Sequence, residues 1–215
     1  MQVAFDKQTL DNGLDVIVHV DRSCPIVAVN LWYHVGSKNE TPGRTGFAHL
    51  FEHLMFEGSE HHDDGYFSPL QEAGGALNGS TNADRTNYWE VVPTGAVERA
   101  LWMESDRMGF LLPALTPEKF ETQRQVVLNE RRESYENRPY GMVPMVLMPV
   151  LFPAGHPYHW LTIGEPADLL AASFDDVQAF FRTYYHPGNA SLVLAGDIDT
   201  REGFELARLY FGEIP

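Results

Sequence analysis

Residues 43–65 read GRTGFAHLFEHLMFEGSEHHDDG and predict a short, mostly apolar helix that carries three polar side chains. His49 and His53 are four residues apart, so on a helix they lie on one face, where two imidazoles can bind one metal ion. Glu52 lies one turn from His49, so its carboxylate can reach a water on the metal without occupying a coordination position. This H-x-x-E-H spacing is the inverted form of the H-E-x-x-H zinc helix. It predicts a zinc site in which Glu52 is the general base.

The apolar neighbours of these three polar side chains favour a metal over the alternative, which is two core histidines and a surface glutamate. They are apolar and predict a largely buried helix: Phe47, Leu50, Phe51 and Leu54. Burial of three polar side chains without partners would cost several kcal/mol. A bound metal ion removes that cost.

A catalytic zinc ion needs a third protein ligand and one open position. Glu57 continues the same helix face, but at about 1.5 Å per residue it lies about 12 Å along the axis from His49. Residues 60–65, EHHDDG, would have to fold straight back to supply a ligand, and we expect them to form a solvated loop. Neither Glu57 nor residues 60–65 is therefore the preferred third ligand.

A second helix, expected over residues 117–136, offers a better third ligand. Phe120, Val127 and Glu130 share one stripe of this helix, so Glu130 lies on the side that enters the core. An inward carboxylate needs a cation, and zinc is one.

The rest of the chain predicts an alternation of hairpins and helices. Asp11-Asn12-Gly13 is a hairpin turn, and strands are expected at 25–36, on both sides of the turn within 76–93, and in ASLVLAGDI. Helices are expected at 65–73, 95–110, 117–136, up to about 151, after Ser173, and in TREGFELARLYFG. Without a strict β-α-β order, this pattern favours an α+β two-layer sandwich with a mostly antiparallel sheet over a doubly wound sheet.

The composition is that of a globular protein with an acidic balance. Of 215 residues, 44% are hydrophobic and 21% are charged, and the formal net charge is −15. This charge argues against a nucleic-acid partner and fits a cationic or neutral ligand. No stretch reaches the ~18 apolar residues that indicate a membrane span. The opening residues, MQVAFDKQTLDNG, show no signal peptide, and cytoplasm and periplasm both stay open as compartments.

Several single residues are expected to have structural roles. Cys24 is the one cysteine, so the chain has no internal disulfide and no cysteine-cluster metal site, and we expect a semi-buried side chain. Four aromatic residues have the spacing of core positions and are expected in the core: Trp89, Trp102, Phe180 and Phe181.

Four segments carry a resemblance to a known family: GRTGFAHLFEHLMFEGS, EAGGALNGSTNADRTNYWEVVP, VVLNERRESYENRPYG and HPYHWLTIGEPADL. They resemble the pitrilysin, or insulinase-like, family of zinc metallopeptidases, over about residues 13–215 and with a mitochondrial processing peptidase-like fold. In that family the third ligand is a glutamate about 77 residues past the second histidine, and here 130 − 53 = 77. The resemblance implies one zinc ion per chain on His49, His53 and Glu130, with Glu52 as the base.

The resemblance also implies how a substrate binds. The family adds its peptide substrate as a strand along a sheet edge, which here falls on Asn78, Gly79 and Ser80. From the residues alone, ALNGST is equally an ordinary surface hairpin. Gln123 departs from the family, because many members have a glutamate there that supports the metal shell. An amide can still hydrogen-bond to a ligand, but it contributes no charge.

The expected function is that of a zinc endopeptidase domain that hydrolyses extended peptides. Residues 1–215 are expected to form a single N-terminal domain, two small α/β halves that share one sheet, and the C-terminal half of the full enzyme is absent from this chain. A second homologous half, a partner chain or a homo-oligomer are the assemblies that the resemblance allows. Two alternatives stay open: a non-catalytic scaffold or assembly subunit, which the intact site residues speak against, and a zinc- and peptide-binding fragment that is inactive without its other half.

Overall fold

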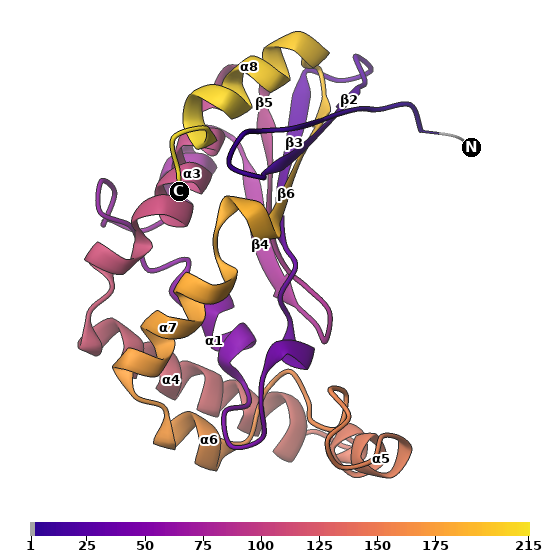
Figure 1. Cartoon of the computed structure of the whole chain (residues 1–215), viewed down its shortest axis with the longest axis vertical. Helices are drawn as coiled ribbons and strands as arrows, with labels where there is room; N and C mark the ends of the chain where they lie inside the picture. Colours follow the sequence, from indigo (N-terminus) through magenta and orange to yellow (C-terminus); the bar gives the residue numbers. More distant parts are fainter. Residues whose placement is uncertain (1–2) are drawn as a thin grey trace.

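In the computed structural model, which describes residues 3–215, the chain forms one sheet of six strands with helices against one face (Figure 1). The strand order is β1-β2-β6-β3-β5-β4, and every neighbouring pair is antiparallel except β2 and β6. The strands are β1 (Asp6–Thr9), β2 (Asp15–Val20), β3 (Ile26–Tyr33), β4 (Ala76–Thr81), β5 (Thr86–Pro93) and β6 (Ala190–Gly196). The predicted α+β fold with a mostly antiparallel sheet is confirmed.

The helices lie on one side of the sheet or below its lower end, where α4, α5 and α6 are found (Figure 1). They are α1 (Phe47–Leu54), α2 (Phe67–Glu72), α3 (Val97–Ala114), α4 (Pro117–Arg131), α5 (Val143–Leu151), α6 (Pro166–Ala171), α7 (Phe174–Tyr184) and α8 (Thr200–Phe211). Short 3-10 turns occupy η1 (Ser37–Asn39), η2 (Thr94–Ala96) and η4 (Pro187–Asn189), and η3 (Arg132–Glu136) is a π-helix. Within residues 3–215, no helix has the length and apolar character that a bilayer crossing requires.

Two helix boundaries differ from their predicted positions. The helix expected over 95–110 continues to Ala114 as α3, with non-helical backbone angles at Phe110. The helix expected over 117–136 keeps α-geometry only to Arg131, after which the chain widens into η3. Thr116 caps α4, because its hydroxyl accepts the backbone N–H of Lys119 at 3.2 Å.

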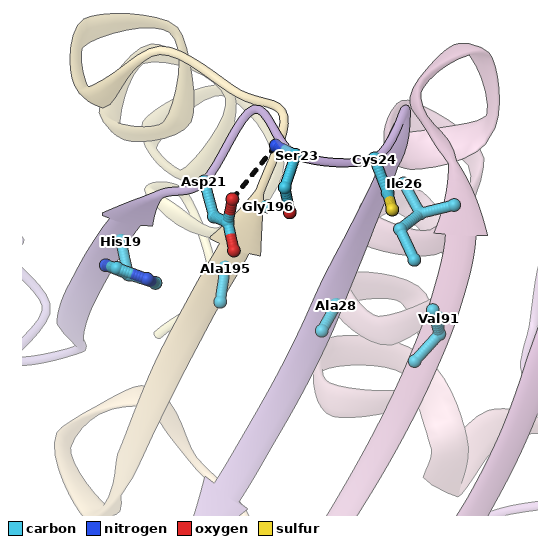
Figure 2. A pocket seen from close by; sticks show the side chains of 9 residues that line it. All are labelled: His19, Asp21, Ser23, Cys24, Ile26, Ala28, Val91, Ala195 and Gly196. Carbon is cyan, nitrogen blue, oxygen red and sulfur yellow. Dashed lines mark hydrogen bonds between the residues drawn. The ribbon is translucent and has the colours of Figure 1, made fainter. Parts of the chain in front are cut away.

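The sheet buries one face and leaves the other uncovered by helices. Val27, Val29 and Leu31 of β3 are fully buried on the helix side, whereas Ala28 on the alternate side is not. The strands expected at 25–36 and in ASLVLAGDI are therefore buried on one face only, because the helices pack against one side of the sheet. Figure 2 shows the other side, where Ala28 and other side chains line a hollow of about 320 Å³ at one end of β3.

Two residues with expected structural roles lie on the surface instead. Cys24, next to the hollow on the uncovered face, is exposed because it lies in the loop between β2 and β3 (Figure 2). Trp102 of α3 is 37% exposed, because the buried face of α3 carries residues such as Leu101, Glu104 and Met108, and not this ring. Of the other expected core aromatics, Phe181 is buried and Trp89 is half-buried.

Candidate metal centre

The two histidines of α1 converge on one point. The Nε2 atoms of His49 and His53 lie 3.4 Å apart, as the four-residue spacing on one helix face predicts. The beginning of α1 is held by a buried carboxylate, because Glu40 accepts the backbone N–H groups of Gly46 at 2.9 Å and Ala48 at 2.8 Å. Burial raises the pKa of the Glu40 carboxyl to about 8, against the two N–H donors, which favour its ionised form.

Helix α4 brings Glu130 to the histidines from a distant part of the chain. Its Oε2 atom lies 3.5 Å from Nε2 of His49 and 3.4 Å from Nε2 of His53. These three residues form a group whose ligand atoms all lie within 4.8 Å of one another. The structure therefore brings together the three residues that the sequence offered as metal ligands.

The spacing of the three ligand atoms fits a tetrahedral metal ion. With Zn–N and Zn–O bonds of about 2.0–2.1 Å, two ligands of a tetrahedral site lie about 3.3–3.4 Å apart, close to the separations here. Burial lowers the pKa of His49 to about 4, so its imidazole is neutral and able to coordinate at neutral pH. The pKa of Glu130 is lowered by its hydrogen bond to His53 and its closeness to His49. The side chains are 12%, 23% and 39% exposed, which leaves one side of the group open to solvent.

The side chain of Glu52 extends from α1 toward the edge strand of the sheet. A Cβ atom added at Gly79 would come within 3.3 Å of its Cγ, so the side chain of Glu52 contacts β4. Burial raises the pKa of Glu52 above its ordinary value. Its carboxylate is outside the three-residue metal group, as expected of a residue that does not coordinate.

The predicted substrate segment is the edge strand β4. Within residues 3–215 it pairs with β5 on one side and with no strand on the other. The backbone N–H of Gly79 donates to Oδ1 of Asn78 at 2.8 Å, and the Ser80 hydroxyl donates to Asn87 at 2.8 Å. The edge that the resemblance implied for peptide binding is thus placed directly beside Glu52.

Gln123 points to a different partner from the one expected. Its Nε2 donates to Oε1 of Glu57 at 2.6 Å, rather than to a residue of the metal group. Glu57 in turn lies beyond the end of α1 at Leu54, so it does not continue the helix face that carries His49. The two residues form a polar pair beside the metal group.

The EHHDDG loop is more tightly held than the expected solvated loop. Asp106 of α3 is buried, and its carboxylate accepts the Ser59 hydroxyl and binds Nδ1 of His61, both at 2.5 Å. This hydrogen bond raises the pKa of His61, although half of its side chain is exposed. The metal group found among residues 3–215 contains no residue of this loop.

A second charged cluster was not predicted from the sequence. Glu90, Glu104 and Arg107 are fully buried, and the Nε of Arg107 donates to Glu104 at 2.9 Å. The guanidinium lies 4.0 Å from the ring centroid of Tyr66 and 4.2 Å from that of Tyr88. Burial and the neighbouring Glu104 raise the pKa of Glu90 well above its ordinary value. The one available signal was the spacing of Glu104 and Arg107, three residues apart on a helix.

Comparison with protein families matches residues 15–152 to the family described as insulinase (peptidase family M16). Residues 171–215 match the peptidase M16 inactive domain. The zinc protease PqqE of Helicobacter pylori is 35% identical over 205 residues, which are 94% of this chain and 46% of that protein. The mitochondrial-processing peptidase subunit beta of Blastocladiella emersonii is 27% identical over 96% of this chain and 44% of its own length. The chain spans about half the length of the curated relatives it matches.

Solved structures agree with these sequence matches. A protease from Helicobacter pylori superposes with a TM-score of 0.94 and 32% identity, over 99% of this chain and 51% of that one. Pitrilysin superposes with a TM-score of 0.86 at 22% identity, over 100% of this chain and 23% of its own, and shows a shared fold. Relatives named zinc proteases imply zinc as the metal, and the donor set of the group described above fits it.

Proposed function

The chain belongs to the insulinase family, peptidase family M16, and from this premise we propose that it is a zinc endopeptidase domain that hydrolyses extended peptides. In this proposal His49, His53 and Glu130 bind one zinc ion and Glu52 is the general base. The convergence of Nε2, Nε2 and Oε2 at 3.4–3.5 Å, from two helices far apart in sequence, is the observation that carries the proposal.

Each residue of the site has a chemical task. When bound, the zinc ion supplies a Lewis acid that acidifies water and polarises the peptide carbonyl. Glu52 accepts the proton of the attacking water and then gives it to the nitrogen of the leaving amine, which regenerates the carboxylate. A pKa raised by burial suits both steps, because the carboxyl group then exchanges a proton closer to neutral pH.

The substrate binds as an added strand along β4. The free edge of this strand and the contact between Gly79 and Glu52 support this, because a peptide paired with β4 then runs beside the base. Oδ1 of Asn78 occupies the Gly79 N–H in the free protein, and a substrate carbonyl takes its place. Gly79 also keeps the strand close to α1, since a Cβ atom there would lie 3.1 Å from the ring of Phe56 and 3.3 Å from Glu52.

Residues 1–215 are proposed to be the N-terminal, metal-binding domain of a longer enzyme, with two small α/β halves that share the sheet. The coverage of about half of each relative favours a second candidate, a domain that binds zinc and peptide but needs another half for turnover. A non-catalytic scaffold would have no use for three converging ligand atoms.

Hydrolysis of a quenched fluorescent peptide library by the zinc-loaded chain tests the proposal, with and without the chain that supplies a second half. We expect Glu52→Gln to lose roughly 10²–10⁴-fold of the activity, the usual contribution of a positioned acid–base group. Glu60→Gln is the matched control, because this exposed loop residue follows the same helix and makes the same change of charge. Activity of Glu52→Gln within a few-fold of wild type would contradict the role of Glu52.

A further inference from the structure

A cavity of about 400 Å³ opens beside the metal group. Glu52 and His53 of α1 line it, followed by Phe56 and Glu57 just past the end of that helix. The other lining residues are Phe67 of α2, Asn78 of β4 and Gln123 of α4. The cavity therefore joins the proposed base, a proposed zinc ligand and the proposed substrate edge in one space.

One wall of the cavity is aromatic. The rings of Phe56 and Phe67 lie 4.8 Å apart between centroids, at an interplanar angle of 31°. Phe67 is 37% exposed, and Phe56 is half-buried. Such a wall provides apolar contact for the methylene stem of a long side chain and a π-face for a cation.

The polar part of the cavity is negatively charged. Oε1 of Glu57 accepts the amide of Gln123 at 2.6 Å, which fixes the carboxylate and leaves its other oxygen free to bind. No Lys or Arg among residues 3–215 lines the cavity. Because Gln123 is neutral, it orients Glu57 without neutralising its charge.

We propose that this cavity is a specificity pocket for a basic substrate side chain, and that Glu57 is the residue that selects it. The inference rests on the proposed function, because a residue that places its side chain against Glu52 and His53 flanks the peptide bond to be cleaved. The stem of a lysine or arginine packs on Phe56 and Phe67, and its charged end pairs with Glu57. The net charge of −15 favours the approach of such a peptide.

The test measures cleavage and binding of paired peptides that differ only in one residue beside the scissile bond: lysine, the uncharged near-isostere norleucine, or glutamate. The zinc-loaded wild-type protein, Glu57→Gln and Glu57→Lys are compared, with Glu60→Gln as the control for loss of one exposed carboxylate. We expect wild type to prefer lysine over norleucine in kcat/KM by about tenfold or more, as for a hydrogen bond to a charged group. Glu57→Gln loses this preference, Glu57→Lys turns it toward glutamate, and Glu60→Gln keeps it.

Binding of the same peptides to Glu52→Gln, followed by fluorescence anisotropy, separates this proposal from the proposed function. Charge-selective binding that depends on Glu57, without turnover in wild type, supports the pocket and counts against the peptidase assignment. Cleavage with the same lysine-to-norleucine ratio in wild type and Glu57→Gln overturns the pocket and leaves the peptidase assignment intact. An absence of both cleavage and charge-selective binding overturns the pocket as well.

Discussion

The metal group and the Glu90–Glu104–Arg107 cluster are two ways to place charged side chains inside one protein. Phe56 adjoins both, because it lines the cavity that His53 also lines, and the Arg107 guanidinium lies 5.2 Å from its ring centroid. In the buried cluster, the cation is the Arg107 guanidinium of the chain itself, and the buried Glu104 carboxylate binds it. In the metal group, two imidazole nitrogens and a carboxylate oxygen face one another, and no Lys or Arg of residues 3–215 pairs with them.

The two clusters differ in the source of their counter-charge, and this separates a structural cluster from one that is available for chemistry. A sealed cluster that supplies its own counter-charge stabilises the fold only while it stays complete. A cluster that is open on one side and made of acceptors requires a cation from solution. Changes in the two clusters are therefore expected to affect different properties of the protein.

The largest effect on stability is expected from Arg107→Met. The change leaves the Glu104 carboxylate buried without its cation, and breaking a buried pair in this way costs about 3–5 kcal/mol. Urea denaturation followed by far-UV circular dichroism measures the free energy of unfolding. Arg201→Met is the control, because Arg201 is exposed and pairs only at the surface with Glu205. Equal stability losses in the two variants would contradict a structural role for the buried cluster.

A smaller effect that depends on zinc is expected from His53→Ala. Zinc at about one hundred times its dissociation constant stabilises the wild-type protein by about 2.7 kcal/mol through linkage. The variant lacks one proposed ligand, so the shift of its melting temperature on zinc addition is expected to disappear. His62→Ala is the control, since His62 lies outside the metal group. An equal shift in wild type and His53→Ala would place the zinc elsewhere.

A third effect is a pH dependence of stability that Glu90→Gln removes. The pKa of Glu90 is raised in the folded protein, so the folded state keeps its proton where the unfolded chain, with a pKa of about 4.3, has lost it. The free energy of unfolding therefore falls as the pH rises above this value, by about 1.4 kcal/mol per pH unit until the raised pKa is passed.

Glutamine cannot ionise, so the wild-type and Glu90→Gln stability curves are expected to diverge with rising pH. Denaturation at several pH values measures the difference, and Glu118→Gln at the exposed start of α4 serves as the control. Parallel curves for wild type and Glu90→Gln would mean that Glu90 is ionised in the folded protein.

Much of the fold was predictable from local patterns. The turn at Asn12-Gly13 carries its signal in adjacent residues, and Gly13 has the φ of +91° that such a turn requires. The helix expected after Ser173 is α7, and Ser173 caps it through a reciprocal pair of hydrogen bonds with Asp176. The spacing of His49 and His53 likewise needs only the geometry of one helix.

Features that depend on contacts between distant segments were not predictable in this way. Glu90 and Arg107 lie on different elements, and nothing in the pattern of either element indicates that the two side chains meet in the core. The same holds for Asp106 and the loop that it holds through His61. Glu130 was found because it lies on the apolar stripe of its own helix, and the resemblance to a known family then pointed to the same residue.

The zinc content per chain tests whether His49, His53 and Glu130 bind the metal ion. Plasma emission spectroscopy is applied to the wild type, Glu52→Gln and Glu130→Gln after zinc loading and removal of unbound metal. We predict about one zinc ion per chain in the wild type and in Glu52→Gln, and loss of most of it in Glu130→Gln, because only the last change removes a ligand. A wild-type protein that retains no zinc, or a Glu130→Gln variant that retains as much as wild type, would contradict the account.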